Sequence, residues 1–117
     1  MALRITRKPT DYISETAYMY DVAQTSKYFD KSVYQRLSAL GDQDSVKQYL
    51  YGLAGYKDKD ISSFNQTDYD YLQSPEDKAS YVLYKLSGET DADTDAYFEY
   101  KIQEAIDKQT YESLNWF

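Results

Sequence analysis

The sequence predicts a small, single-domain, all-α protein: a helical bundle of about five helices with an extended N-terminal arm. Three observations support this fold class. A chain of 117 residues suits one domain with one modest core. Apolar residues recur at helical spacing in several segments. Residues that favour helix starts and ends flank most of these segments.

Residues 1–9, MALRITRKP, are expected to form the arm. Apolar and basic residues alternate there, and Pro9 biases the preceding residue toward an extended backbone. A helical domain, residues 10–117, is expected to follow. Its first helix is predicted to begin after Thr10 as N-cap and to continue to about Phe29.

Two further helices are predicted in the first half of the chain. Asp30 as N-cap and Gly41 as a C-terminal stop bound the second helix. Asp42 or Asp44 starts the third, and Gly55 ends it. The apolar residues expected to face the core are Val33, Leu37, Leu40, Val46, Tyr49, Leu50 and Leu53.

A polar loop is predicted near residues 56–73, where helical periodicity is lost. Ile61 and Phe64 are expected to anchor it, and a turn of helix fits near Asp68 to Leu72. A loop of this length inside a compact domain either has a function or contains an unrecognised short helix.

The clearest local signals lie in SPEDKASYVLYKLSG. Ser74 can serve as N-cap, Pro75 suits the first helical position, and Gly88 suits the end. The buried face is expected to contain Ala79, Val82, Leu83 and Leu86.

The last predicted helix covers DAYFEYKIQEAIDKQTYESLNWF, with Asp93 or Thr94 as N-cap. The segment finishes in an apolar tip that contains Trp116 and Phe117. Such a tip either packs on its own core or inserts into a partner.

Composition argues against several classes of function. The absence of cysteine excludes disulfides and thiolate chemistry, and the absence of histidine removes the commonest general base and transition-metal ligand. No catalytic, cofactor-binding or metal site is predicted, and no small-molecule substrate is expected. We also expect no membrane span and no signal peptide, which favours a soluble chain in the cytoplasm or in a virion.

The net charge of −7 is unevenly distributed. Residues 1–65 carry 9 basic and 8 acidic side chains, a net +1, whereas residues 66–117 carry 4 and 12, a net −8. Phosphate would repel the acidic part, so direct nucleic-acid binding by the body is not expected. Within the first ten residues, Arg4, Arg7 and Lys8 meet no acid.

The segment DADTDAYFEYK contains the spacing of a calcium loop only in part. Asp91, Asp93 and Asp95 match the first, third and fifth positions of an EF-hand. The required glycine is replaced by Ala96, and the bidentate glutamate by Ile102. The preferred interpretation is a helix N-terminus, whose dipole favours carboxylates.

Tyrosine is unusually frequent, with 15 residues against 4 phenylalanines and 1 tryptophan. Its ring is apolar and its hydroxyl seeks a partner, so tyrosine suits both a core boundary and an interface. The sequence leaves both interpretations open.

These observations favour a non-catalytic interaction protein. The role that they favour is a structural or assembly component of a larger complex, such as a phage particle, with protein partners. The arm and the apolar C-terminus are expected to dock on those partners. The predicted partner-binding residues are Leu3, Arg4, Ile5, Arg7, Trp116 and Phe117.

An alternative is an acidic inhibitor that blocks the basic groove of a host protein. In composition alone, the second half resembles DNA-mimic inhibitors of restriction or CRISPR systems, in which carboxylates imitate phosphates. The acidic surface predicted for this role contains Asp91, Asp93, Asp95 and Glu99.

Overall fold

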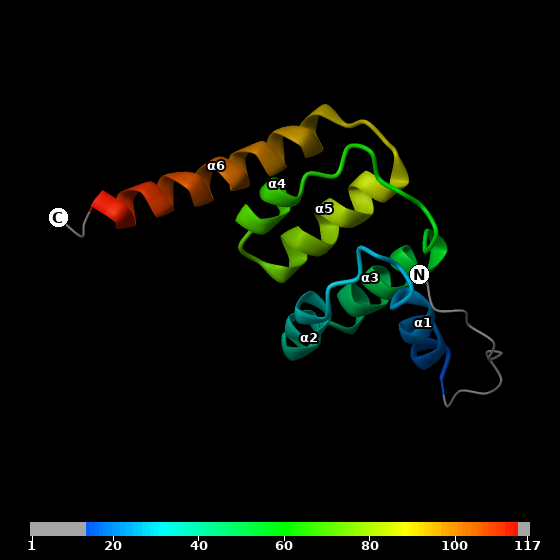
Figure 1. Cartoon of the computed structure of the whole chain (residues 1–117). Coiled ribbons are helices and arrows are strands. Elements are labelled where there is room, and N and C mark those ends of the chain that lie inside the picture. Colours follow the sequence, from blue (N-terminus) through cyan, green and yellow to red (C-terminus); the bar gives the residue numbers. More distant parts are fainter. Residues whose placement is uncertain (1–13, 115–117) are drawn as a thin grey trace. The chain divides into compact units, whose positions relative to one another are not determined.

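The computed structural model describes residues 14–114, and every regular element in that range is a helix (Figure 1). The predicted all-α class is therefore confirmed. The described residues form two compact units, the first ending at Ser62 and the second beginning at Ser63. In unit 1 the helices are α1 (Glu15–Ala23), α2 (Lys31–Ala39) and α3 (Gln43–Gly55); in unit 2 they are α4 (Gln66–Tyr71), α5 (Pro75–Ser87) and α6 (Ala92–Leu114).

The core of unit 1 is built on α3, which packs against both α1 and α2. Tyr49, Leu50 and Leu53 of α3 are fully buried. Asp30 and Asp42 cap α2 and α3 as predicted. The buried residues that these three helices contribute are Val22, Ala23, Val33, Leu37, Val46, Tyr49, Leu50 and Leu53.

Leu40 departs from the predicted inward face, because its side chain is 57% exposed. It is the C-cap of α2, one position beyond the last helical residue. Gly41 follows with φ +79°, a left-handed conformation that turns the chain away from the helix. The helix therefore ends before Leu40 can complete the stripe.

The first helix is shorter than the predicted span from Thr10 to Phe29. It begins after Ser14, whose Oγ accepts the backbone N–H of Ala17 at 3.2 Å. It ends at Ala23 because the next residues satisfy backbone groups with side chains: Thr25 Oγ1 donates to the Val22 carbonyl at 2.6 Å. The predicted cap, Thr10, lies outside the described residues.

In unit 2, α5 matches its predicted start and end. Ser74 Oγ accepts the backbone N–H of Asp77 at 3.0 Å, and Gly88 ends the helix with φ +72°. Ala79, Val82 and Leu86 of the predicted face are buried, and Leu83 is half-buried. Tyr81, which was not on that face, is buried instead.

The predicted polar loop contains a short helix, α4, in addition to the five helices that the sequence predicts. Asn65 caps it by accepting the backbone N–H of Asp68 at 3.0 Å. Both expected anchors bury apolar surface, Ile61 in unit 1 and Phe64 in unit 2, where its ring lies 5.6 Å from that of Tyr81. The unit boundary falls between them, so each anchor belongs to a different unit.

The predicted cap of the last helix is wrong by two or three positions. α6 begins at Ala92, and Asp91 precedes it rather than Asp93 or Thr94. The Asp91 carboxylate accepts the backbone N–H of Asp93 at 3.0 Å, and its carbonyl accepts that of Asp95 at 2.9 Å. Asp91 starts the helix because its carboxylate accepts a free backbone N–H of the first turn.

Tyrosine hydroxyls accept the backbone N–H of residues that precede helices, which is a use of tyrosine that composition does not reveal. Such an N–H lies outside the helix and needs an acceptor from elsewhere. The three pairs are Asp30 with Tyr49 (2.9 Å), Asn65 with Tyr81 (3.2 Å) and Asp91 with Tyr84 (2.9 Å).

Candidate functional site

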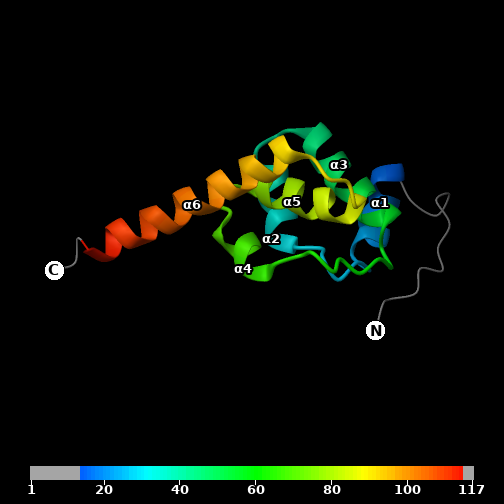
Figure 2. The ribbon, with the colours of Figure 1, turned by 90° about the horizontal axis from the view of Figure 1, so that it is seen from above.

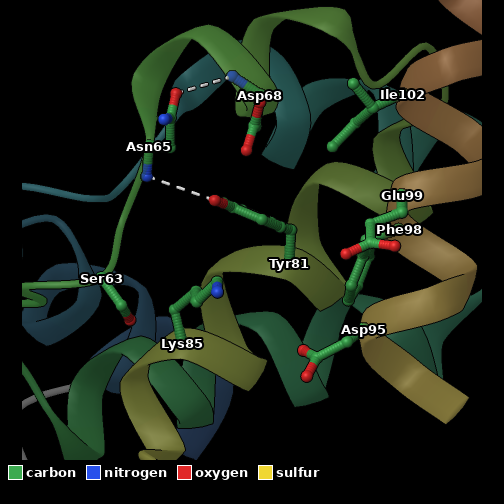
Figure 3. Close-up of a pocket in the computed structure, with 9 residues that line it drawn as sticks. All are labelled: Ser63, Asn65, Asp68, Tyr81, Lys85, Asp95, Phe98, Glu99 and Ile102. Atoms are coloured by element: carbon green, nitrogen blue, oxygen red, sulfur yellow. Dashed lines mark hydrogen bonds between the residues drawn. The ribbon is translucent and has the colours of Figure 1, made fainter. Parts of the chain in front are cut away.

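Unit 2 contains a groove that side chains from α4, α5 and α6 line (Figure 3). Its main hollow has a volume of about 340 Å³. A second hollow of about 210 Å³ shares Ser63, Lys85 and Asp95 with the first, so the two lie side by side. We call this feature the unit 2 groove; its principal residues are Asp68, Tyr81, Lys85, Glu89, Asp95, Phe98 and Glu99.

The base of the unit 2 groove is aromatic. Tyr81 is 3% exposed, and its ring meets that of Phe98 edge to face at 5.4 Å between centroids. Its hydroxyl is held by the backbone N–H of Asn65. Burial raises the pKa of Tyr81 above its ordinary value, so the hydroxyl is neutral at physiological pH. The base is therefore uncharged and closely packed, with very little of the Tyr81 ring open to a ligand.

Carboxylates surround this base. Asp68 comes from α4, whereas Asp95 and Glu99 come from successive turns of α6 (Figure 3). The Tyr84 hydroxyl donates to Asp95 at 2.8 Å and fixes that side chain. Glu99 is exposed and available to a ligand.

Lys85 contributes the positive charge among the lining residues. Its Nζ lies 5.5 Å from the ring centroid of Tyr81 and 5.8 Å from that of Tyr84. With four carboxylates and one ammonium, the lining of the two hollows carries a net charge of −3. A cationic group is the ligand that this negative charge suits.

The four residues of the predicted acidic surface divide between two places. Asp95 and Glu99 lie together in the unit 2 groove. Asp91 is engaged in capping α6, and Asp93 is exposed on the first turn. Within residues 14–114, no three acidic side chains are grouped as metal ligands. The aspartate run thus starts a helix, as the sequence favours.

The predicted docking residues cannot be placed in the same way. Leu3, Arg4, Ile5 and Arg7 precede the described range, and Trp116 and Phe117 follow it. Their role therefore stays a prediction.

α6 carries a second apolar face besides its buried one. The buried side contains Phe98 and Ala105. Successive residues are about 100° apart around a helix, which places three large exposed side chains within roughly 60° of one another and nearly opposite that buried side. We call them the α6 outer face: Tyr100 (64% exposed), Tyr111 (66%) and Leu114 (66%).

The far end of α6 lies clear of the rest of unit 2. Residues 107–114 are all exposed. Figures 1 and 2 both show this end running past α4 and α5. The sequence missed this feature because the same periodicity predicts a packed helix and a projecting one.

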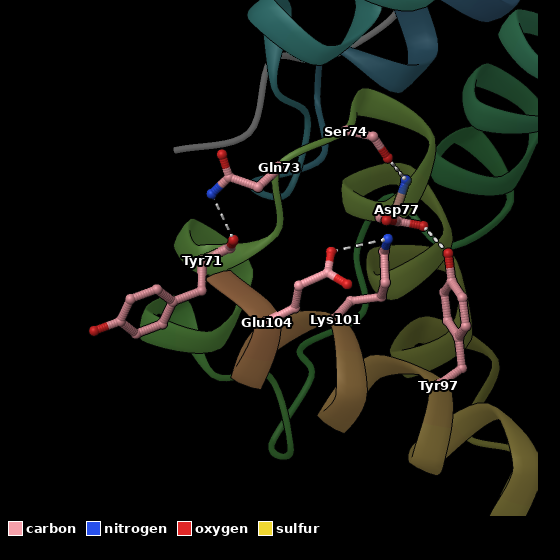
Figure 4. A network of polar contacts seen from close by, with 7 residues as sticks. All are labelled: Tyr71, Gln73, Ser74, Asp77, Tyr97, Lys101 and Glu104. Carbon is pink, nitrogen blue, oxygen red and sulfur yellow. Dashed lines mark hydrogen bonds and ion pairs between the residues drawn. The ribbon is translucent and has the colours of Figure 1, made fainter. Parts of the chain in front are cut away.

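A buried carboxylate links α5 to α6. Asp77 is 8% exposed and receives the Tyr97 hydroxyl at 2.6 Å; Lys101 and Glu104 form an ion pair nearby (Figure 4). This hydrogen bond, with a smaller effect of desolvation, raises the pKa of Tyr97 to about 12. The sequence places Asp77 in the first turn of a helix, and local patterns could not reveal its partner twenty residues later.

Comparisons with known proteins give no relative: no family model, curated protein or solved structure matches the chain. None of the described helices is long and apolar enough to cross a membrane. Function must therefore be argued from the surfaces of the molecule itself.

Proposed function

We propose that the chain is a non-catalytic interaction protein, serving as a structural or assembly component of a larger complex. A virus particle is one assembly of this kind. The proposal rests on the α6 outer face and on the exposed end of that helix. In it, α6 and the apolar residues that follow form the main docking element.

The length of α6 supports this role. Its 23 residues extend over about 35 Å, whereas the 13 residues of α5 extend over about 20 Å. Most helical stability in proteins comes from tertiary packing, and every residue of segment 107–114 is exposed. A partner that buries Tyr111 and Leu114 would supply such packing, at roughly 1.5–3 kcal/mol for each side chain.

The charge of α6 defines the partner. The helix carries six acidic and two basic side chains, a net charge of −4. An apolar groove with a basic rim would complement both the outer face and this charge. A second copy of α6 would be repelled, so we assign the outer face to a different, basic protein.

The terminal residues fit the same scheme. In the proposal, Trp116 and Phe117 extend the apolar contact beyond α6, since buried aromatics often dominate binding energy. Leu3 and Ile5 anchor the arm, while Arg4 and Arg7 pair with acidic neighbours.

The test compares two double variants on exposed positions of α6. Tyr111→Ala with Leu114→Ala removes the two outer-face side chains of the projecting end, whereas Gln109→Ala with Ser113→Ala changes the other side of the same turns. We expect the first to weaken co-sedimentation with the native assembly by roughly tenfold or more, at low and high salt. The second should bind like the natural chain. Equal binding by both variants would exclude α6 as the docking element.

An acidic inhibitor is the second candidate, favoured by the exposed carboxylates of Asp93 and Glu99. Replacing both by lysine leaves Asp91 and Asp95 with their hydrogen bonds. For an inhibitor, this change and raised salt should each weaken binding to a basic partner steeply. Binding that survives both treatments would eliminate this candidate.

A further inference from the structure

The unit 2 groove is chemically suited to a basic side chain. Carboxylates gathered in a hollow favour an arginine or lysine through charge-assisted hydrogen bonds. Tyr81 supplies the aromatic base, and Asp68 and Glu99 supply carboxylates from opposite helices.

The positions of the charged groups narrow the binding place. Lys85 already lies over the Tyr81 and Tyr84 rings, and Asp95 already receives the Tyr84 hydroxyl. An incoming cation is therefore directed away from Lys85, toward Asp68 and Glu99. Among the residues drawn in Figure 3, none forms a hydrogen bond with the carboxylate of Asp68 or Glu99.

The same sequence supplies a ligand with matching charge. The arm, residues 1–9, carries Arg4, Arg7 and Lys8 and no acidic residue, a charge of +3 against the −3 of the groove lining. Its apolar residues Leu3 and Ile5 alternate with the basic ones, so one short segment offers both cations and apolar contacts.

We propose that the unit 2 groove binds the basic arm of a second copy of this chain, with arginine paired to the carboxylates of Asp68 and Glu99. The contact is heterologous, since arm and groove are different surfaces. It repeats from copy to copy and leads to rings or filaments rather than to a closed pair. The inference rests on the proposed assembly role and names one of its partners.

Sedimentation velocity of the full chain over a range of concentrations tests this inference. The natural chain should self-associate at low salt and dissociate as salt screens the charges. Arg4→Glu with Arg7→Glu (the arm variant) and Glu99→Lys (the groove variant) should each weaken self-association by roughly tenfold or more. Glu112→Lys is the matched control, because it makes the same charge change at an exposed position of α6 outside the groove.

Mixing the two variants is the decisive step. The groove variant keeps an intact arm, and the arm variant keeps an intact groove. Together they should form a one-to-one pair that stops growing, although neither associates alone. Circular dichroism of each variant confirms that it is folded.

Three results would overturn the inference. They are a natural chain that stays monomeric at every concentration, an arm variant that associates as before, or a mixture that forms no pair. Each leaves the proposed function standing if the Tyr111 and Leu114 variant still loses its native assembly. A variant that loses self-association but still binds the native assembly would likewise show that the arm–groove contact and the docking of α6 are separate.

Discussion

Units 1 and 2 use tyrosine in the same way but leave different surfaces. In each, a buried tyrosine hydroxyl binds the backbone N–H of a residue that precedes a helix, Asp30 through Tyr49 and Asn65 through Tyr81. Unit 1 carries a net +1, and unit 2 a net −8. The tyrosine content alone therefore does not identify an interface; what identifies it is the surface that remains after the rings are packed.

The two buried tyrosines show this contrast directly. Tyr49 is fully enclosed, with its ring 6.1 Å from that of Phe29, and burial raises its pKa strongly. Tyr81 is almost as buried, yet it lines the unit 2 groove. The first lies wholly within a core, whereas the second lies where the core of unit 2 meets the groove.

The largest effect is expected at Tyr49. Tyr49→Ala should lower the free energy of unfolding by about 3–5 kcal/mol, because it leaves a cavity in the core of unit 1. Tyr49→Phe keeps the ring and should cost only about 1 kcal/mol, the value of the lost hydrogen bond with Asp30. Urea unfolding followed by far-ultraviolet circular dichroism measures both.

Tyr81→Phe sharpens the comparison between the units. It should cost about as much stability as Tyr49→Phe, since the Asn65 N–H likewise loses its acceptor. If the two phenylalanine variants differed by several kcal/mol, the hydroxyls would not be equivalent and the shared use of tyrosine would be wrong.

Local signals predicted those parts of the fold in which neighbours in sequence decide the structure. Ser74, Pro75 and Gly88 specify α5 through hydrogen bonds and backbone angles that depend on adjacent residues. The same holds for Asp30 and Asp42 as caps of α2 and α3. These elements were therefore predicted with the correct starts.

Only part of the candidate site could be predicted: Asp95 and Glu99 belong to the predicted acidic surface, but the groove itself depends on contacts distant in sequence. Asp68 meets Asp95 and Glu99 only once α4 and α6 have packed in unit 2. Tyr97 finds Asp77 across twenty positions. A clue was present, since Asp95 and Glu99 are four apart and so share one face of a helix.

The N-caps of α5 in unit 2 and α1 in unit 1 offer a second comparison between the two units. Ser74 and Ser14 each accept a backbone N–H three residues on, at 3.0 and 3.2 Å. Ser74→Ala should cost about 1 kcal/mol because the site is partly buried. Ser14→Ala should cost less, since water can replace the exposed hydroxyl. Equal losses in urea unfolding would contradict the role of burial.

Alkaline titration tests the link between α5 and α6. The pKa of Tyr97 is about 12 in the folded chain, above the ordinary value of about 10, so the fold favours the neutral hydroxyl. Its contribution is fully present below about pH 10 and is lost as the pH rises toward 12. The Asp77 hydrogen bond is the cause, and Tyr97→Phe should remove this contribution.

Thermal unfolding between pH 8 and pH 12 measures that contribution. Tyr49 also contributes stability that is lost at alkaline pH, because burial raises the pKa of its hydroxyl. The Tyr97→Phe variant should therefore keep a pH dependence, but a shallower one than the natural chain. An unchanged profile would mean that the Asp77 contact does not persist in solution.

The smallest effect on stability is expected at the end of α6, where the largest effect on binding is proposed. Tyr111→Ala and Leu114→Ala should each change the free energy of unfolding by less than about 0.5 kcal/mol, because both side chains are two-thirds exposed. Amide hydrogen exchange should be fast over residues 107–114 and slow around Phe98, and a bound partner should slow it. A large loss of stability instead would assign Tyr111 and Leu114 to the core, and the α6 outer face would no longer be a docking surface.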